Sequence, residues 1–313
     1  MSDTIDLVFH SEMSLRLDKY LAGINHPRLY SRSVVEKLFA AEKVLVNGKP
    51  VKKSYLLNPE DCIRIELPAL QPSHLEPQQI PLEIVFEDEF LAVINKPPAL
   101  VVHPGHGNRS NTLANAIAYR YSDTLRPTEQ NNRPGIVHRL DKGTSGLIVV
   151  ARNEAVQAKL AELFARRQVK KTYLAVTVGI PEPAADTIET YISRSSGNPR
   201  KMAVHSSGKL ARTSYEIIRY YQGFALLSIN LSTGRMHQIR VHLADRNTPV
   251  LGDNLYGSEA DVLNRVPANL RRKLSELLAH HLQRQALHAW KLQFIHPVVG
   301  AQHLSASYVR KGA

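Results

Sequence analysis

The first 67 residues carry the pattern of two short helices. Apolar side chains recur at helical spacing over residues 17–24, with Ser14 ahead of them as a candidate N-cap. Ser33 and Glu36 stand three residues apart, as in a capping box, and mark the start of a second helix. The side chains that would form the buried face of this second helix are Val35, Leu38 and Phe39.

Strand signals follow these helices. Residues 44–46 form an apolar run that ends at Asn47-Gly48, the dipeptide that best supports a tight hairpin turn. Residues 62–67 alternate apolar and polar side chains, as in a half-buried strand. Four prolines then fall within residues 68–81, which excludes a regular element. The pattern divides the chain into a small α/β module at 14–67, a Pro-rich linker at 68–81 and a body at 82–313.

The body has the pattern of many strands with few helices. One hairpin is predicted across Glu87-Asp88-Glu89 and another at Gln222-Gly223. Asn153 is a candidate N-cap for one helix, and residues 236–244 predict another. The predicted strands are 82–86, 90–95, 146–151, 169–178, 214–220 and 225–231. Because these strands do not alternate with helices, the body is predicted to be α+β with a mainly antiparallel mixed sheet.

Composition and charge narrow the class of partner. Of the 313 residues, 43% are hydrophobic and 22% are charged, which is ordinary for a folded globular protein. Lys and Arg number 40 against 28 Asp and Glu, so the formal net charge is +12. This excess favours a polyanionic partner such as nucleic acid, with a basic surface kept for solubility as the alternative. Seven basic residues against two acidic ones lie between Arg28 and Lys53, which fits either a phosphate-docking stripe or a solvated helix face.

The sequence also predicts where the protein works. Cys62 is the single cysteine, so neither an intramolecular disulfide nor a Cys-x-x-Cys site can form. The first residues are acidic and lack the apolar core of a signal peptide. No apolar run approaches the roughly 18 to 20 residues that span a bilayer. We therefore expect a soluble cytoplasmic protein that does not enter a membrane.

Three segments of the body place polar, charged and glycine residues where a core would need apolar ones, namely 135–146, 170–173 and 232–242. Asp141 is the one carboxylate of these segments, and Arg139 and Lys142 flank it. Cationic neighbours favour the ionised form of a carboxylate, which can then act as a nucleophile or a base. An Asp that closes a turn before a glycine is the alternative, and this loop alone favours that structural role.

The third segment supplies a candidate partner for Asp141. His237 and Arg240 are three residues apart, so a helix would place them on one face, with Arg235 at its start. An Arg on such a face can pair with a buried carboxylate through two parallel hydrogen bonds, and Asp141 is the candidate. His237 and His242 are five residues apart, which does not match a helical zinc pair, so no metal is expected.

The N-terminal module resembles a known RNA-binding module, that of the ribosomal protein S-four type. The residues that carry this resemblance are Arg16-Leu-Asp-Lys-Tyr-Leu-Ala, Tyr30-Ser-Arg-Ser and Val44-Leu-Val-Asn-Gly-Lys. The resemblance covers residues 14–67. It implies that the two helices and the following turn dock on structured RNA by shape and backbone charge.

The body resembles the RluA-type pseudouridine synthases. The motifs are His138-Arg-Leu-Asp-Lys-Gly-Thr-Ser-Gly146, Lys171-Thr-Tyr173 and Gly234-Arg-Met-His-Gln-Ile-Arg-Val-His242, in this order. Shorter matches are Asn95-Lys-Pro-Pro, His103-Pro-Gly, Gly252-Asp-Asn-Leu-Tyr-Gly257, Arg284-Gln-Ala-Leu-His-Ala289 and His296-Pro297. With its N-terminal module, the chain is most similar to the RluD-like branch, which modifies large-subunit ribosomal RNA.

The resemblance implies a pseudouridine synthase fold and roles for several residues. Asp141 matches the catalytic aspartate, Tyr173 the tyrosine that stacks on the target uracil, and Arg240 the arginine that pairs with the aspartate. Arg139 matches the residue that fills the gap left by the flipped base. Gly143 stands where many relatives carry a second acid. The residues expected to contact RNA are Arg139, His138, Lys171, Arg235, Arg28, Arg32 and Lys37.

The implied reaction isomerises specific uridines to pseudouridine in large-subunit ribosomal RNA or the pre-ribosomal particle. The bond between C1′ and N1 breaks, the uracil turns, and C5 takes the place of N1, so no atoms are gained or lost and no cofactor is expected. The base must leave its stack at a cost of a few kcal/mol. An aromatic platform such as Tyr173 returns about 1 to 3 kcal/mol of that cost. The sequence leaves open whether Asp141 acts as nucleophile or base, and we expect a monomer.

Two other functions fit parts of the pattern. A hydrolytic glycosylase usually needs two carboxylates, whereas the three polar segments contain only Asp141. A non-catalytic RNA-binding or ribosome-assembly factor fits the N-terminal module and the charge, but has no need for the set of Asp141, Tyr173 and Arg240. Without the family motifs, Tyr173 would be an ordinary strand aromatic. The sequence therefore favours the isomerase.

Overall fold

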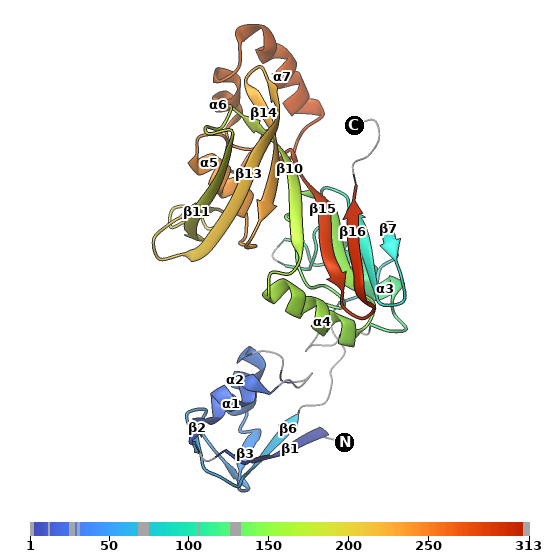
Figure 1. Cartoon of the computed structure of the whole chain (residues 1–313), viewed down its shortest axis with the longest axis vertical. Coiled ribbons are helices and arrows are strands. Elements are labelled where there is room, and N and C mark those ends of the chain that lie inside the picture. The colour runs from blue at the N-terminus through green and yellow to red at the C-terminus, as the bar shows by residue number, and fades with distance from the viewer. Residues whose placement is uncertain are drawn as a thin grey trace. The chain divides into compact units, whose positions relative to one another are not determined.

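The computed structural model describes residues 3–11, 13–24, 29, 32–67, 75–105, 107–125 and 133–308. The chain divides between His74 and Leu75 into two compact units, which are described separately (Figure 1). No helix in the described part of the chain is long and apolar enough to cross a bilayer.

The first unit is a small antiparallel sheet with two helices. Its elements are β1 (Asp3–Phe9), β2 (Leu15–Arg16), α1 (Leu17–Gly23), α2 (Arg32–Ala40), β3 (Val44–Val46), β4 (Lys49–Pro50), β5 (Leu56–Leu57) and β6 (Asp61–Leu67). The sheet has the order β1-β6-β3-β4, and β2 pairs with β5. Leu17 and Leu21 of α1 pack with Ile63 and Ile65 of β6 in its core. The sequence placed the start of this unit at residue 14, but β1 pairs with β6 along its whole length and extends the unit to residue 3.

Of three local signals predicted in this unit, the hairpin turn is confirmed and the two helix starts are wrong. Asn47 and Gly48 both have positive φ, +50° and +78°, and connect β3 to β4 as the Asn-Gly signal predicted. Ser14 is not the N-cap of α1, because Leu15 and Arg16 pair with β5 and the helix begins after Arg16. The capping box is also displaced, since α2 begins at Arg32 and Ser33 lies within its first turn.

The second unit is built on a ten-stranded sheet. Its helices are α3 (Leu113–Arg120), α4 (Glu154–Ala165), α5 (Gln238–Asp245), α6 (Glu259–Asn264) and α7 (Ala268–His280). Its strands are β7 (Glu83–Glu87), β8 (Leu91–Lys96), β9 (Ser145–Ala151), β10 (Lys170–Val178), β11 (Ala185–Arg194), β12 (Met202–Val204), β13 (Lys209–Tyr221), β14 (Phe224–Leu231), β15 (Leu287–His296) and β16 (Gly300–Ser307).

The sheet is mainly antiparallel, and the predicted α+β class is confirmed. Its strand order is β12-β11-β13-β14-β10-β15-β9-β8-β7, with β16 paired to β15. Among the named strand pairs of the described residues, β15 and β9 form the parallel one. There Gly146 meets Ala289, and a Cβ on Gly146 would lie 2.3 Å from the Ala289 carbonyl oxygen. A glycine at this position therefore permits the parallel contact at the centre of the sheet.

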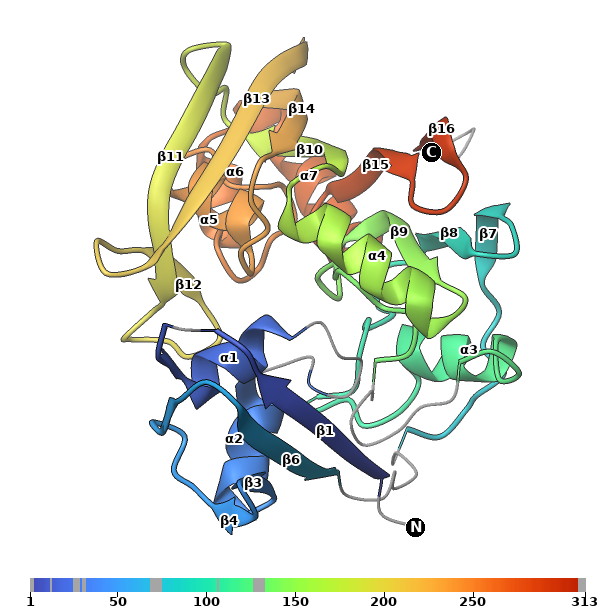
Figure 2. The ribbon, with the colours of Figure 1, turned by 60° about the horizontal axis from the view of Figure 1, so that its bottom comes forward.

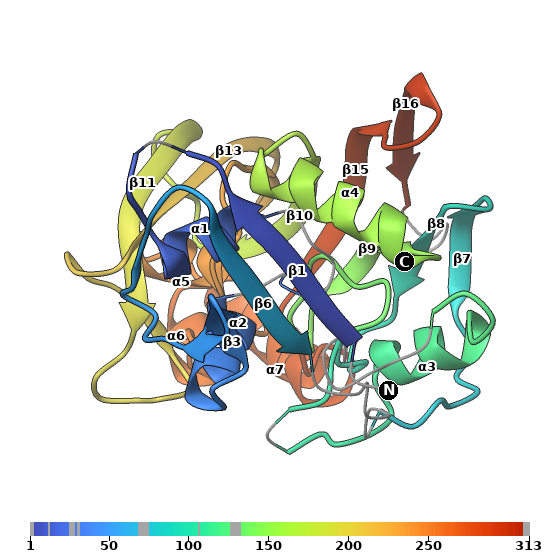
Figure 3. The ribbon, with the colours of Figure 1, turned by 90° about the horizontal axis from the view of Figure 1, so that it is seen from below.

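Both faces of the sheet are covered at β9, which explains the continuous apolar run of this strand. α4 lies beside β9 (Figure 2), and Leu147 and Val149 of this strand pack with Val156 and Leu160 of the helix. The alternate residues of β9 face a second core that includes side chains of α3 and α5. α5 itself packs beside β12 and β13 (Figure 3). A smaller apolar cluster holds α6 and α7 against the end of β10.

Two boundaries of this unit differ from the sequence prediction. Part of the predicted linker belongs to the unit, because Leu75 is buried in its core and the Asn115 side chain donates to the Glu76 carbonyl. The helix predicted at 236–244 begins at Gln238, since His237 is its N-cap and has a left-handed φ of +56°. Asn153 caps α4 as predicted, its side chain accepting from the Val156 N–H.

Candidate active site

Asp141 lies in the loop that follows residues 135–137 and leads into β9. Backbone hydrogen bonds hold this loop in place. The Thr144 N–H donates to the Asp141 carbonyl at 3.0 Å, which closes a turn around Lys142 and Gly143. The Ala99 N–H donates to the Lys142 carbonyl at 2.9 Å. These two bonds fix the backbone at Asp141 and at the residue that follows it.

The buried ammonium group of Lys96 also holds this loop in place. Lys96 is fully buried at the end of β8 and donates to the carbonyls of Pro97 and Leu100, both at 2.9 Å, and of Lys142 at 3.5 Å. Burial lowers the pKa of Lys96 to about 8, against the opposing charge of Asp141. The lysine therefore links the segment after β8 to the Asp141 loop through main-chain oxygens.

The packing around position 143 explains why a glycine stands there. A Cβ at that position would lie 2.3 Å from the Oε1 atom of Gln285. Gln285 is buried and donates from Nε2 to the Thr144 hydroxyl at 3.1 Å. The amide of Gln285 thus fills the space that a side chain at position 143 would need. This contact explains why the loop has a glycine there and not an acidic residue.

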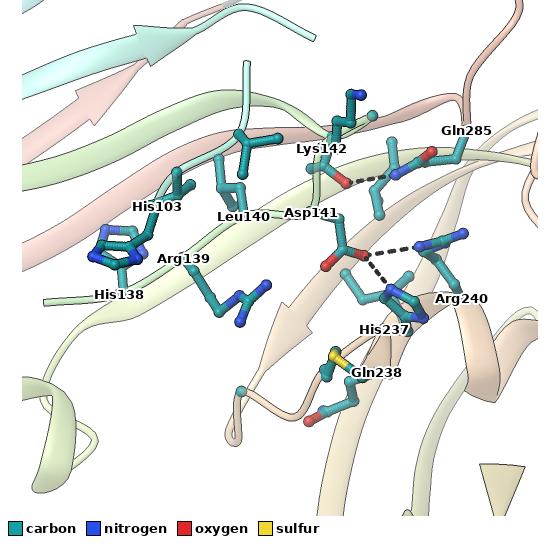
Figure 4. Close-up of a pocket in the computed structure, with 18 of the residues that line it drawn as sticks. His103, His138, Arg139, Leu140, Asp141, Lys142, His237, Gln238, Arg240 and Gln285 are labelled. Carbon is teal, nitrogen blue, oxygen red and sulfur yellow. Dashed lines mark hydrogen bonds and ion pairs between the residues drawn. The ribbon is translucent and has the colours of Figure 1, made fainter. Parts of the chain in front are cut away.

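Arg240 lies between two carboxylates. Its Nη1 donates to Asp141 Oδ2 at 3.1 Å (Figure 4). Its Nε and Nη2 donate to Asp253 at 2.6 and 2.8 Å, so the two-bond pair forms with Asp253 and not with Asp141 as the sequence suggested. Burial opposes the charge of Arg240, but Asp253 and then Asp141 outweigh it and raise its pKa. Asp253 is thereby saturated, whereas Asp141 keeps lone pairs for another partner.

His237 also reaches Asp141, although it precedes the helix. Its Nε2 lies 3.9 Å from Asp141 Oδ2, and its Nδ1 lies 2.9 Å from the hydroxyl of Tyr256. That hydroxyl accepts the Met202 N–H and can also donate its own hydrogen to Nδ1; in that tautomer the imidazole hydrogen is on Nε2 and faces Asp141. Burial lowers the pKa of His237, with Arg240 adding to the effect against Asp141. In that tautomer, a neutral imidazole presents an N–H beside the carboxylate.

Tyr173 lines the same cleft from β10. Its side chain is 8% exposed and packs in the core between β14 and β15. Burial and then the charge of Asp141 raise the pKa of its phenol, which keeps it neutral at physiological pH. The ring is therefore a rigid, uncharged surface near the carboxylate, as a stacking role requires.

The other predicted RNA contacts are not alike. Arg139 is exposed on the cleft, and its guanidinium lies on the side that faces Asp141 and His237 (Figure 4). Lys171 and Arg235 also line the cleft. His138 does not fit a charged contact, because its Nε2 accepts the Val149 N–H at 3.0 Å and burial lowers its pKa to about 3. Arg28 and the side chains of Arg32 and Lys37 lie outside the described residues.

One cleft of about 1910 Å³ in the second unit is lined by Asp141, Tyr173, His237 and Arg240. Among the described residues that line it, Asp141 is the one carboxylate. The cationic lining residues are Arg133, Arg139, Lys142, Lys171, Arg194, Arg200, Arg235, Arg240 and Arg284. Such a lining attracts a polyanion and leaves a single acid at its centre. Within the described ranges, no group of three or more His, Cys, Asp or Glu side chains could hold a metal ion.

Comparison with known proteins agrees with this geometry. The sequence profile described as RNA pseudouridylate synthase matches residues 90–245. An uncharacterized RNA pseudouridine synthase of Chlorobaculum parvum is 41% identical over 91% of this chain and 88% of its own. The chain belongs to the RNA pseudouridine synthase family. It is therefore an enzyme, an isomerase that makes pseudouridine in RNA.

Two further relatives bear on this family's branch and fold. The ribosomal large subunit pseudouridine synthase D of Escherichia coli K12 is 39% identical over 94% of this chain and 87% of its own. The solved structure of human RNA pseudouridylate synthase domain containing 4 has a TM-score of 0.55 and 27% identity, and covers 74% of this chain and 89% of its own. The predicted pseudouridine synthase fold and the resemblance to the RluD-like branch are confirmed.

Four residues that support the candidate site were given no role by the sequence analysis. Asp253 and Tyr256 lie in the Gly252–Gly257 motif, which was matched without a role. Lys96 and Gln285 likewise lie in shorter matched motifs. Their task is visible only once the chain folds, because each acts through a neighbour that is distant in sequence. The one signal for Asp253 in the sequence was the pattern Asp-x-x-Tyr soon after Arg240.

Proposed function

We propose that this pseudouridine synthase modifies specific uridines of large-subunit ribosomal RNA and that Asp141 is its catalytic carboxylate. The observation that carries the assignment of Asp141 is its position as the one carboxylate among the described residues of a cation-lined cleft. Its side chain is 18% exposed, so it can be reached by a base that leaves the RNA stack.

The neighbours of Asp141 suit this task. Arg240 stabilises the ionised carboxylate through one charge-assisted hydrogen bond, and Asp253 holds the guanidinium in place. The remaining carboxylate oxygen, Oδ1, can approach C1′ of the ribose, the uracil ring or the C2′ proton, and each of these routes needs the same ionised group. Tyr173 is placed to stack on the uracil while its bond to the ribose is broken and remade through C5.

The arrangement argues against hydrolysis of the glycosidic bond. Hydrolysis usually needs a second carboxylate to activate water. Asp253 is the nearest described candidate, but both its oxygens accept from Arg240 and its side chain is 1% exposed. Water activation by Asp253 would require loss of that pair, so rejoining of the base is the better supported outcome.

The RNA class is inferred from relatives and from charge. Relatives of about 40% identity over most of the chain are named as large-subunit pseudouridine synthases, and the cleft suits a polyanion. A cytoplasmic location and a monomeric state belong to the same proposal. RNA contact through the first unit, by Arg28, Arg32 and Lys37, belongs to it too.

Release of tritium tests this proposal. Pseudouridine formation replaces the C5 hydrogen of uridine, so transcripts labelled with tritium at C5 release label into water as product forms. We expect release from a large-subunit transcript and none from a small-subunit transcript of matched length. Release from the small-subunit transcript alone would overturn the RNA class while leaving the isomerase in place.

A further inference from the structure

A second cavity of about 260 Å³ adjoins the catalytic cleft. It is formed by the end of α4, the start of β10 and the loop from Leu231 to Arg235. Lys171, Gly234 and Arg235 line both cavities, so the two spaces share a wall. Among the described residues that line the second cavity there is no carboxylate, and Arg167 adds a further cation. The cavity is smaller than those that usually hold drug-sized ligands.

Lys171 is the unusual group in this cavity. Its side chain is half-buried and burial lowers its pKa, yet in the described chain its ammonium has no hydrogen-bond acceptor and no carboxylate partner. The ammonium lies over the ring of Phe164, with Nζ 5.9 Å from the ring centre. A half-buried charge without an anion costs free energy, so a partner supplied from outside the chain would relieve that cost.

Gly234 leaves the space over this ammonium open. Its φ lies outside the left-handed region, so the backbone itself does not demand a glycine. A Cβ there would meet a single atom within 4 Å, Lys171 Nζ at 3.8 Å. A side chain would therefore fit the protein but would occupy the place where an anion would approach the lysine.

The loop around Gly234 is rigid and presents a second cation. Gln238 Oε1 accepts from the Arg235 N–H at 3.0 Å and from the Thr233 hydroxyl at 2.7 Å, which ties the loop to the start of α5. The Nε of Arg235 donates to the Leu210 carbonyl at 3.0 Å. The terminal nitrogens of Arg235 have no acceptor within the described part of the chain. Two cations on a fixed frame thus face one small space.

We propose that Lys171, Arg235 and the open face of Gly234 form a phosphate subsite that binds one phosphodiester group of the RNA next to the target uridine. The proposal rests on the proposed function, because RNA supplies the phosphate. Lys171 and Tyr173 are alternate residues of β10 and both line the catalytic cleft. Alternate strand residues on one face lie about 7 Å apart, a distance that one nucleotide spans. The subsite would hold the backbone while Tyr173 holds the base.

Salt dependence of RNA binding tests this subsite. The dissociation constant of a large-subunit ribosomal RNA transcript is measured over a range of KCl concentrations for the wild type, Lys171→Met and Gly234→Ala. The exposed Lys159 of α4 supplies the matched control Lys159→Met. We expect Lys171→Met to lower the slope of log Kd against log salt by about 0.7 to 0.9, the value for one phosphate contact. Gly234→Ala should also weaken binding and lower this slope. Lys159→Met should leave the slope unchanged.

Thermal unfolding separates this role from a structural one. Because Lys171→Met removes a half-buried unpaired charge, its Tm should equal or exceed that of the wild type. A lower Tm with an unchanged slope would make Lys171 a structural residue and overturn the subsite. Binding of inorganic phosphate that requires Lys171, with the RNA slope unchanged, would assign the site to a free anion and overturn the RNA assignment.

The proposed function can fail separately. Tritium release by the wild type with an unchanged slope in Lys171→Met would retain the function and reject the subsite. A reduced slope in Lys171→Met, without tritium release from the large-subunit transcript, would retain the subsite and reject that transcript as the substrate.

Discussion

Asp253 takes two hydrogen bonds from Arg240 and Asp141 takes one, so the two carboxylates have different tasks. Asp253 also accepts the backbone N–H groups of Leu255 and Tyr256, which makes it part of a turn as well as an anchor. Arg240 orients the Asp141 carboxylate, which keeps free lone pairs. The precise placement of one carboxylate therefore depends on the saturation of another.

Asp253→Asn should destabilise the enzyme and lower its activity. The substitution removes a buried charge that balances Arg240, and loss of one partner of a buried pair costs about 3 to 5 kcal/mol. We expect a clear fall in Tm together with loss of turnover. Asp141→Asn is the control, because Asp141 makes one bond and is partly exposed, and its Tm should stay near that of the wild type. Equal Tm values for both variants would contradict the anchoring role.

Gly143→Ala should be destabilising through contact with Gln285. The added Cβ would meet the buried Gln285 amide, and overpacking of this kind costs about 1 to 3 kcal/mol. The double variant Gly143→Ala with Gln285→Ala should recover part of the lost Tm, since the amide no longer fills the space. Additive losses in the two single variants and the double variant would show that the two positions do not compete for this space.

The site residues were only partly predictable from the sequence, for a physical reason. The motifs placed Asp141 and Arg240 together because the family pattern carries that pairing. The sequence could not give Asp253 as the two-bond partner, because that contact depends on how the turn at 252–257 folds back on α5. His237 lies near Asp141, but it precedes the helix with a left-handed backbone, so it does not share a helix face with Arg240 as the sequence predicted.

At the scale of elements, α5 is the part that brings the third polar segment to the site. His242 fixes it to the sheet, since the imidazole bonds Thr213 of β13 at 2.8 Å and Thr190 of β11 at 3.0 Å. The ring is fully buried. Strand β11 itself was not predicted, because most of its side chains are exposed or half-buried and polar residues interrupt its apolar alternation. Strands with a clear apolar alternation, such as β10 and β14, were predicted correctly.

His242 should contribute to a fall in the stability of the enzyme on acidification. Burial lowers the pKa of His242 to about 4, against an ordinary value near 6.5. Between these values the unfolded state binds more protons than the folded state, so the contribution is present above pH 6.5 and is lost as the pH falls towards 4. Each pKa unit is worth about 1.4 kcal/mol, so the loss reaches about 3 kcal/mol near pH 4.

Unfolding by denaturant at several pH values measures this loss. His242→Gln removes the titrating group, so the free energy of unfolding of this variant should depend less on pH between 6.5 and 4 than that of the wild type. His280→Gln alters an exposed histidine and is the control. Parallel pH dependence in the wild type and His242→Gln would contradict the assignment of this effect to His242.

At the scale of the whole molecule, catalysis and the predicted S-four-type docking reside in separate compact units. The first unit has its own apolar core, and Leu75 begins the second unit by packing in the other core. The sequence predicted a division of the chain in the Pro-rich segment. It could not place the boundary at residue 74, because the bonds of Glu76 and Gln78 to residues near α3 are tertiary contacts.

Removal of residues 1–74 should weaken RNA binding while the catalytic unit stays folded. The cut leaves Leu75 and its contacts in place, so cooperative unfolding should persist. We expect a weaker affinity for the large-subunit transcript, measured as a raised Kd, because the contacts of the predicted docking module are lost. An unchanged Kd and unchanged activity on the same transcript would show that the first unit is dispensable for this RNA.

Pseudouridine mapping tests most directly whether the enzyme isomerises uridines of ribosomal RNA with Asp141 as its catalytic carboxylate. Ribosomal RNA is incubated with the wild type or with Asp141→Asn, modified with carbodiimide and read by primer extension. We expect new stops at defined uridines of the large-subunit RNA with the wild type and none with Asp141→Asn. The same stops with Asp141→Asn would contradict the catalytic assignment, and no stops with either protein despite tight binding would contradict the substrate.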